Sequence, residues 1–168
     1  MDPEGSHWLI QAKDFDKQRQ IRWSNLARFS PIGGTSRYEL KLDDVLFLAR
    51  GQDNFACHID RDLKATVVAN TFYILRPNQE MVLSPFLAWW LNQTPAQDYI
   101  KLRRSGGSLP FISISALLQL EISIPTFEIQ NKILELEKLR KQEANLTASL
   151  FEKKSVLIEA VSLNAINE

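Results

Sequence analysis

The chain has 168 residues, of which 45% are apolar, and its 20 basic and 20 acidic residues leave no net charge. This length and composition predict one globular domain, or one domain with an appendage, and argue against indiscriminate binding to polyanions. The longest apolar run, 86–91, is too short to cross a bilayer, and the acidic amino terminus is unlike a secretory signal. We therefore expect a cytoplasmic protein that does not associate with membranes.

The few cysteine and histidine residues limit metal, redox and nucleophilic chemistry. Cys57 is the single cysteine, which excludes an internal disulfide and suits a reducing cytoplasm. Cys57 beside His58 resembles half of a metal site, but His7 is the only other histidine, so we predict no metal. No Ser/His/Asp or Cys/His spacing indicates a catalytic set, and the glycine-rich cofactor loop of methyltransferases is absent. We expect a binding protein without a cofactor.

The amino-terminal part of the chain carries short strand signals. Apolar segments at 8–11 and 21–23 flank a charged stretch, which predicts two strands, or a strand and a loop. The Gly, Ser and Pro cluster at 29–38 predicts a loop. A nucleotide phosphate loop is not predicted there, because no lysine follows Gly34.

Two stronger strand signals follow. Residues 42–51 predict a turn and then a buried strand that ends at a glycine, with the polar 52–54 at the edge of the sheet. β-Branched and aromatic residues crowd 66–75, which is the strongest strand signal in the chain, and the Arg-Pro pair after it ends the strand.

Two helices are predicted next, each with its own start signal. Ser84 places a capping hydroxyl before a proline, and Thr94 repeats this arrangement with Gln97 where a capping box needs it. We expect the second helix to run to about Arg104 and to be ended by the glycine pair that begins at Gly106, because glycine tolerates the left-handed backbone of a helix end.

The connection to the last helix contains three shorter elements. Residues 109–114 predict an extended piece, 115–119 a single helical turn and 120–124 a final strand. In the helix predicted to end near Arg104, we expect Tyr99 and Leu102 to face the core.

The order of the predicted elements indicates the fold class. Strands, then helices, then a short strand and a long helix define an α+β fold with a mixed or mainly antiparallel sheet.

The last quarter of the chain predicts one long helix. No Gly or Pro occurs after Pro125, and the helix would extend for roughly 50 Å at 1.5 Å per residue. Thr126 is positioned to cap it, and Glu128 places a negative charge in its first turn. We predict a domain at 7–124 and a helix at 125–168 that projects and pairs with another helix, the alternative being a helix packed on its own domain.

A heptad seam on this helix is apolar at both ends and polar in the middle. In an antiparallel pair, Arg140 would match Glu143 of the partner helix and fix the register. Two leucines lie just beside the polar positions, so the apolar stripe drifts as it does on a straight helix. The residues predicted to form a homodimer contact are Ile129, Ile133, Leu136, Leu139, Arg140, Glu143, Leu146, Leu150, Leu157 and Val161.

Four segments, in this order, carry a family resemblance. Residues 42–51 resemble a strand motif that ends in Arg-Gly, 84–101 a two-helix stretch, 106–120 a glycine loop followed by Ile-Ser, and 122–133 a hinge that starts a helix with Glu, Gln and Ile. Together they resemble a target-recognition domain and its conserved helix in the DNA specificity subunits of type I restriction-modification systems. Asp43 departs from the motif, in which glycine is usual, and this leaves the geometry of its turn open.

The resemblance implies a non-catalytic subunit that recognises a specific sequence in double-stranded DNA. Specificity subunits typically contain two recognition domains and two helices, whereas this chain has one of each, so it resembles a half-subunit. By this resemblance, two copies would pair through antiparallel helices, recognise a two-part site and dock DNA-methyltransferase (modification) subunits, with restriction subunits as further partners. The alternative is a coiled-coil scaffold protein that does not bind DNA, which the neutral charge allows.

Candidate DNA contacts come from two kinds of segment. Arginine and amide side chains on the predicted loops suit base edges in the major groove. Basic residues and glycines in the stretch without acids between Asp98 and Glu121 suit phosphates. For each arginine, a solvated surface charge is the simpler alternative. The candidates are Arg37, Tyr38, Arg50, Gln52, Asn54, Lys101, Arg103, Arg104, Ser105, Gly106 and Gly107.

Overall fold

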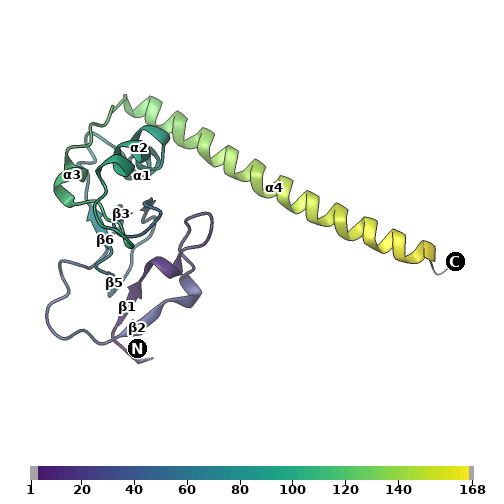
Figure 1. Cartoon of the computed structure of the whole chain (residues 1–168), viewed down its shortest axis with the longest axis horizontal. Helices are drawn as coiled ribbons and strands as arrows, with labels where there is room; N and C mark the ends of the chain where they lie inside the picture. Colours follow the sequence, from purple (N-terminus) through teal and green to yellow (C-terminus); the bar gives the residue numbers. More distant parts are fainter. Residues whose placement is uncertain (1–3, 167–168) are drawn as a thin grey trace. The chain divides into compact units, whose positions relative to one another are not determined.

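The structure, a computed structural model, describes residues 4–166 (Figure 1). The chain divides between Phe127 and Glu128 into two compact units. The first is a globular domain, called the head below, and the second consists of a single long helix. No helix among the described residues is long and apolar enough to cross a membrane.

The first sheet of the head is mixed. Its central strand, β1 (His7–Ile10), pairs with antiparallel β2 (Ala27–Phe29) on one side and with parallel β5 (Thr66–Val68) on the other. Of the two alternatives predicted for 8–11 and 21–23, a strand and a loop is correct, because Ser and Asn favour turns and a 3-10 helix lies at Trp23–Asn25 (η2). Another 3-10 helix, η1 (Ala12–Asp14), follows β1.

The second sheet is antiparallel, with β3 (Val45–Leu48) between β4 (Ala56–His58) and β6 (Phe72–Leu75). The apolar run at 66–75 is therefore two strands in two sheets, and the prediction of one strand was wrong. A turn separates them, in which the Phe72 amide donates to the Ala69 carbonyl at 3.1 Å. The predicted α+β class with mixed or antiparallel strands is confirmed.

Strand β3 lies at the centre of the head, and all four of its residues are buried, as 42–51 predicted. Leu46 and Leu48 join the core cluster that also contains Ile10 of the first sheet. Val45 and Phe47 alternate to the opposite face, where α1 (Ser84–Leu91) packs on β3 and β4.

The predicted helix caps at Ser84 and Thr94 were wrong. Each is the first residue of its helix, α1 or α2 (Thr94–Arg103), and neither helix has a side-chain cap. Tertiary contacts use the polar groups instead. The buried Ser84 hydroxyl donates to the Asp43 carbonyl at 2.5 Å, and the Gln97 amide donates to the Leu91 carbonyl at 2.6 Å.

Helix α2 ends close to the predicted residue, but the glycine pair does not cap it. It stops at Arg103, and Arg104 is extended, so Gly106 turns the chain back toward Phe111 rather than capping the helix. Leu102 is 81% exposed and was wrongly placed in the core, which Ile100 enters instead.

After α2 the chain forms α3 (Ile114–Leu118), one turn capped by the Ser113 hydroxyl, as expected near this position. Residues 120–124 are not a strand. Glu121 and Ser123 are exposed and Ile122 is only half-buried, so the segment has no apolar face to hold it against a sheet.

The second unit is α4 (Phe127–Ile166), whose 40 residues correspond to about 60 Å. The predicted long carboxy-terminal helix is thereby confirmed. Glu128 lies in its first turn and accepts from Lys132 at 2.6 Å. Such i,i+4 pairs contribute a few tenths of a kcal/mol each to an exposed helix.

The turn before β3 carries the motif position where the family has glycine. Asp43 has a φ of 65°, the left-handed conformation that glycine adopts freely. Its carboxylate lies 2.9 Å from His58 Nε2, and its carbonyl accepts from Ser84. Asp43 therefore adopts a backbone conformation that glycine would also allow.

The next residue, Asp44, is a buried carboxylate, only 2% exposed. Arg76 donates to its two oxygens at 2.8 and 3.1 Å, and the Lys41 amide adds a third hydrogen bond at 2.8 Å. The hydrogen bond to Asp44 raises the pKa of Arg76 above its usual range, so the guanidinium group stays charged. The ion pair joins the start of β3 to the end of β6.

We predict that Arg76→Ala lowers the free energy of unfolding by about 2 kcal/mol, because it leaves the buried Asp44 carboxylate without its charged partner. Urea denaturation at neutral pH measures this loss. Arg37→Ala, in an exposed loop, is the matched control and should change stability by less than about 0.5 kcal/mol. Equal stability of the two variants would contradict the proposed importance of the pair.

A second prediction isolates the backbone at Asp43. Asp43→Ala and Asp43→Gly both remove the contact with His58, but only alanine is strained at positive φ. Asp43→Ala should therefore be less stable than Asp43→Gly by about 1 kcal/mol. Thermal unfolding of the two variants side by side measures the difference, and alanine equal to or better than glycine would show that the turn is not held left-handed.

Candidate nucleic-acid interface

The two loops that carry most of the predicted DNA contacts are hydrogen-bonded to each other. The Gly51 amide donates to the Pro110 carbonyl at 2.9 Å. Arg104 Nη1 donates to the Gln52 carbonyl at 2.5 Å, and the Gln52 side chain donates to the Ser108 carbonyl at 3.3 Å. Residues 50–54 and 104–111 thus form one continuous surface, called the loop surface below.

Aromatic rings hold two of the predicted arginines in place. The guanidinium carbon of Arg50 lies 5.5 Å from the ring centroid of Phe111, and that of Arg103 lies 3.8 Å from the ring centroid of Tyr99. Both arginines are exposed. A guanidinium group stacked in this way keeps its N–H edges available for a phosphate or a base.

The predicted Ser-Gly-Gly segment forms the turn of the loop surface. The Ser105 and Phe111 backbones exchange two hydrogen bonds of 2.8 Å. Gly106 has a φ of 97°, and a Cβ there would lie 3.2 Å from the Leu109 carbonyl oxygen, so this position requires glycine. A Cβ on the exposed Gly107 would meet nothing within 4 Å. The backbone at Gly107 is therefore open to a close approach.

A polar depression of about 300 Å³ opens at the edge of the loop surface. It brings together four of the predicted residues with six that the sequence analysis did not select. Asn54 is only 3% exposed, and its Nδ2 donates to the Leu48 carbonyl at 2.8 Å, so it positions the loop from within. The lining residues are Arg19, Gln52, Asp53, Asn54, Asn92, Thr94, Gln97, Asp98, Lys101 and Arg104.

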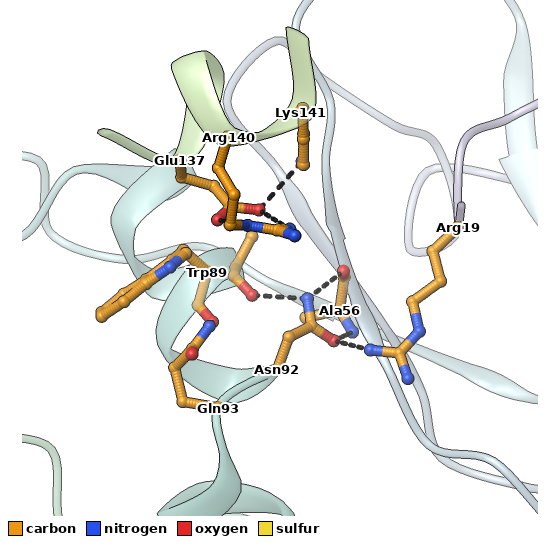
Figure 2. A network of polar contacts seen from close by, with 9 residues as sticks. Arg19, Ala56, Trp89, Asn92, Gln93, Glu137, Arg140 and Lys141 are labelled. Atoms are coloured by element: carbon orange, nitrogen blue, oxygen red, sulfur yellow. Dashed lines mark hydrogen bonds and ion pairs between the residues drawn. The ribbon is translucent and has the colours of Figure 1, made fainter. Parts of the chain in front are cut away.

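Asn92, at the end of α1, connects three parts of the head (Figure 2). Its Oδ1 accepts from the Ala56 amide at 3.0 Å and from Arg19 Nη1 at 2.9 Å, and its Nδ2 donates to the Ala56 and Ala88 carbonyls, each at 2.8 Å. Ala56 begins the edge strand β4, so the amide satisfies both backbone groups of Ala56 as a neighbouring strand would. The sequence gives no signal for a contact this distant.

Arg19 comes from a tight turn at 16–20 that the sequence analysis treated only as a charged stretch. The Asp16 carboxylate accepts from the Gln18 and Gln20 amides at 2.9 and 2.8 Å, and Arg19 has a φ of 61°. Aspartate often begins a turn, because its carboxylate can accept from the amide two residues later. Asp16, within the charged stretch, is therefore the sequence signal that could have indicated this turn.

Arg37 and Tyr38 do not join the loop surface. Their loop follows β2, and the Tyr38 carbonyl accepts from Val68 of β5 at 3.3 Å. Figure 1 shows this loop beside the first sheet, at the end of the head away from α2. Both residues are exposed, so they would contact DNA only as a separate region.

The described residues offer no grouping for a metal ion. No group of three or more His, Cys, Asp and Glu side chains within 4–166 could hold one. His58, the possible half of a metal site, contacts Asp43 instead.

Helix α4 exposes the apolar positions of the predicted seam. Leu136 and Leu157 are 66% and 63% exposed, and Leu150 and Val161 are similarly open. Exposed apolar side chains thus repeat along this helix and form an open apolar stripe.

In the polar middle of the seam, Arg140 bonds within its own helix. It donates to both carboxylate oxygens of Glu137 at 2.7 Å, and Lys141 Nζ lies 3.8 Å from the same group (Figure 2). The hydrogen bond from Arg140 lowers the pKa of Glu137. The contribution of this pair to helix stability is thus present above the ordinary carboxylate pKa and is lost as the pH falls through the lowered value.

The head and α4 together define a class of protein: a small α+β domain with a polar loop surface, continued by a long helix with an open apolar stripe. Comparison with known proteins shows which of them are similar to this chain in sequence or in fold. No protein-family model matches the chain. It is 27% identical over 115 residues to the Type I restriction enzyme HindI specificity subunit of Haemophilus influenzae, covering 66% of this chain and 25% of that protein.

A solved structure has a similar fold. The crystal structure of an S subunit from a type I restriction-modification system of M. genitalium matches 90% of this chain and 36% of its own, with a TM-score of 0.51 and 17% identity. The chain therefore spans about a quarter and about a third of these two relatives. The resemblance to type I specificity subunits that the four motifs predicted is confirmed.

Proposed function

We propose that this chain is a DNA-specificity subunit of a type I restriction-modification system. The observation that carries the proposal is the similarity to a named specificity subunit over 115 residues. The S-subunit fold, matched over 90% of the chain, supports it. In this role the chain selects a DNA sequence in the cytoplasm and carries out no chemistry itself. The modification subunit, and the restriction subunit where present, would act where the chain directs them.

The loop surface is the proposed DNA-contacting region of the head. Arg50 and Gln52 have the arginine and amide groups that can pair with base edges. Lys101, Arg103 and Arg104 have basic groups that suit phosphates. Ring stacking of Arg50 limits its rotamers before DNA arrives, which reduces the entropic cost of binding. Arg37 and Tyr38 would add a second, separate contact.

We further propose that α4 pairs antiparallel with α4 of a second copy. Its open apolar stripe supplies the contact, and the two heads would then recognise the two parts of one DNA site. The number of residues in α4 would set the spacing between the two DNA half-sites.

The proposal predicts that the purified chain, alone or with its modification subunit, enriches one sequence from a pool of random duplexes. Binding to the enriched duplex should be at least about 10³-fold tighter than to a shuffled duplex and should weaken with salt. Fluorescence anisotropy at several salt concentrations measures both. Equal binding to every duplex would contradict sequence recognition, and no DNA binding with the modification subunit present would favour the coiled-coil scaffold.

A separate prediction tests the helix pairing. Leu150→Glu buries a charge in the seam and should convert a dimer into a monomer of 19.3 kDa, measured by light scattering. Ser149→Glu adds the same charge to the neighbouring, exposed position outside the seam and should leave the dimer intact. A wild-type monomer, or a dimer that survives Leu150→Glu, would rule out pairing through this stripe.

A further inference from the structure

We infer that the polar depression is a phosphate-binding site for the DNA backbone, in which Arg19 acts together with Lys101 and Arg104. The inference rests on the proposed function and adds to it a contact from the amino-terminal part of the head. Nothing in the sequence pattern pointed to Arg19, because it lies far along the chain from the other two.

Two segments that lie far apart in the sequence bring basic side chains to one depression. The turn at 16–20 brings Arg19, and the end of helix α2 with the residue after it brings Lys101 and Arg104. The site is also continuous with the loop surface, since Gln52 and Arg104 belong to both and are joined by a hydrogen bond of 2.5 Å. A DNA backbone lying on the loop surface would reach the depression without a change of direction.

The Arg19 side chain is held in place by contacts within the head. The turn at 16–20 is fixed by the two hydrogen bonds to Asp16, and the guanidinium group is fixed by Asn92 Oδ1 at 2.9 Å. Arg19 also lies over the Phe55 ring, with 5.7 Å between its guanidinium carbon and the ring centroid. Because the side chain lies along the protein surface, it suits a phosphate that meets that surface better than a base edge deep in a groove.

The acidic residues that line the depression do not prevent it from binding a phosphate. Asp98 lies 3.7 Å from Lys101 Nζ, but both side chains are about 60% exposed, and such exposed pairs are weak. Lys101 can therefore exchange Asp98 for a phosphate at little cost. Asp53 is exposed on the loop beside Gln52. With three basic and two acidic side chains, the site retains a positive balance.

Arg19→Ala tests the inference, with a fluorescent mixed-sequence duplex of about 30 base pairs as the probe. Removal of one phosphate contact should weaken binding on the order of tenfold. It should also reduce the slope of log K against log salt by about 0.9 and weaken the enriched and shuffled duplexes by the same factor. Arg19→Lys keeps the charge and should retain the slope.

Lys17→Ala is the matched control, because Lys17 is an exposed basic residue of the same turn that does not line the depression. It should leave affinity and slope nearly unchanged. Arg19→Ala that behaves like Lys17→Ala, or that alters the preferred sequence, would overturn the phosphate assignment while leaving the proposed function intact. Failure of the wild-type chain to bind any duplex, both alone and with its modification subunit, would instead overturn the proposed function and the inference with it.

Discussion

The head depends on the turn that precedes β3, where two consecutive aspartates connect four elements. The buried Asp44 carboxylate binds Arg76 at the end of β6, while the Asp44 carbonyl accepts from Ile59 after β4. The Asp43 carbonyl accepts from Ser84 at the start of α1. A carboxylate this deeply buried would be costly without a charged partner, so the ion pair determines where β3 begins relative to its neighbours. The loop surface starts at the other end of this short strand.

At the polar depression, the side chain of Asn92 likewise connects separate elements of the head. An edge strand such as β4 presents backbone groups that need a partner, and the amide of Asn92 supplies both a donor and an acceptor to Ala56. The same Oδ1 atom holds Arg19. One side chain therefore closes the sheet edge and positions a cation, which makes the geometry of the depression a consequence of the fold.

Local patterns in the sequence predicted much of the fold, and distant contacts account for most of the errors. The strand at Val45–Leu48 and the uninterrupted last helix were predicted correctly because an apolar run and a run without Gly or Pro can both be recognised from neighbouring residues. The run at 66–75 was misassigned because β-branched residues favour strands without specifying a sheet. At the candidate interface, composition alone selected Lys101 and Arg104. Arg19 was missed because its role depends on a contact made only after folding.

The polar middle of α4 has a different meaning once its own hydrogen bonds are known. In the proposed antiparallel pair, Arg140 can meet Glu143 of the partner only by giving up its bidentate contact with Glu137, or by sharing its remaining N–H groups. An exchange of one ion pair for another contributes little net free energy. Association would then come from the apolar positions toward the two ends, where leucines are open. The charged middle would mainly select orientation, because a parallel pair would place like charges opposite each other.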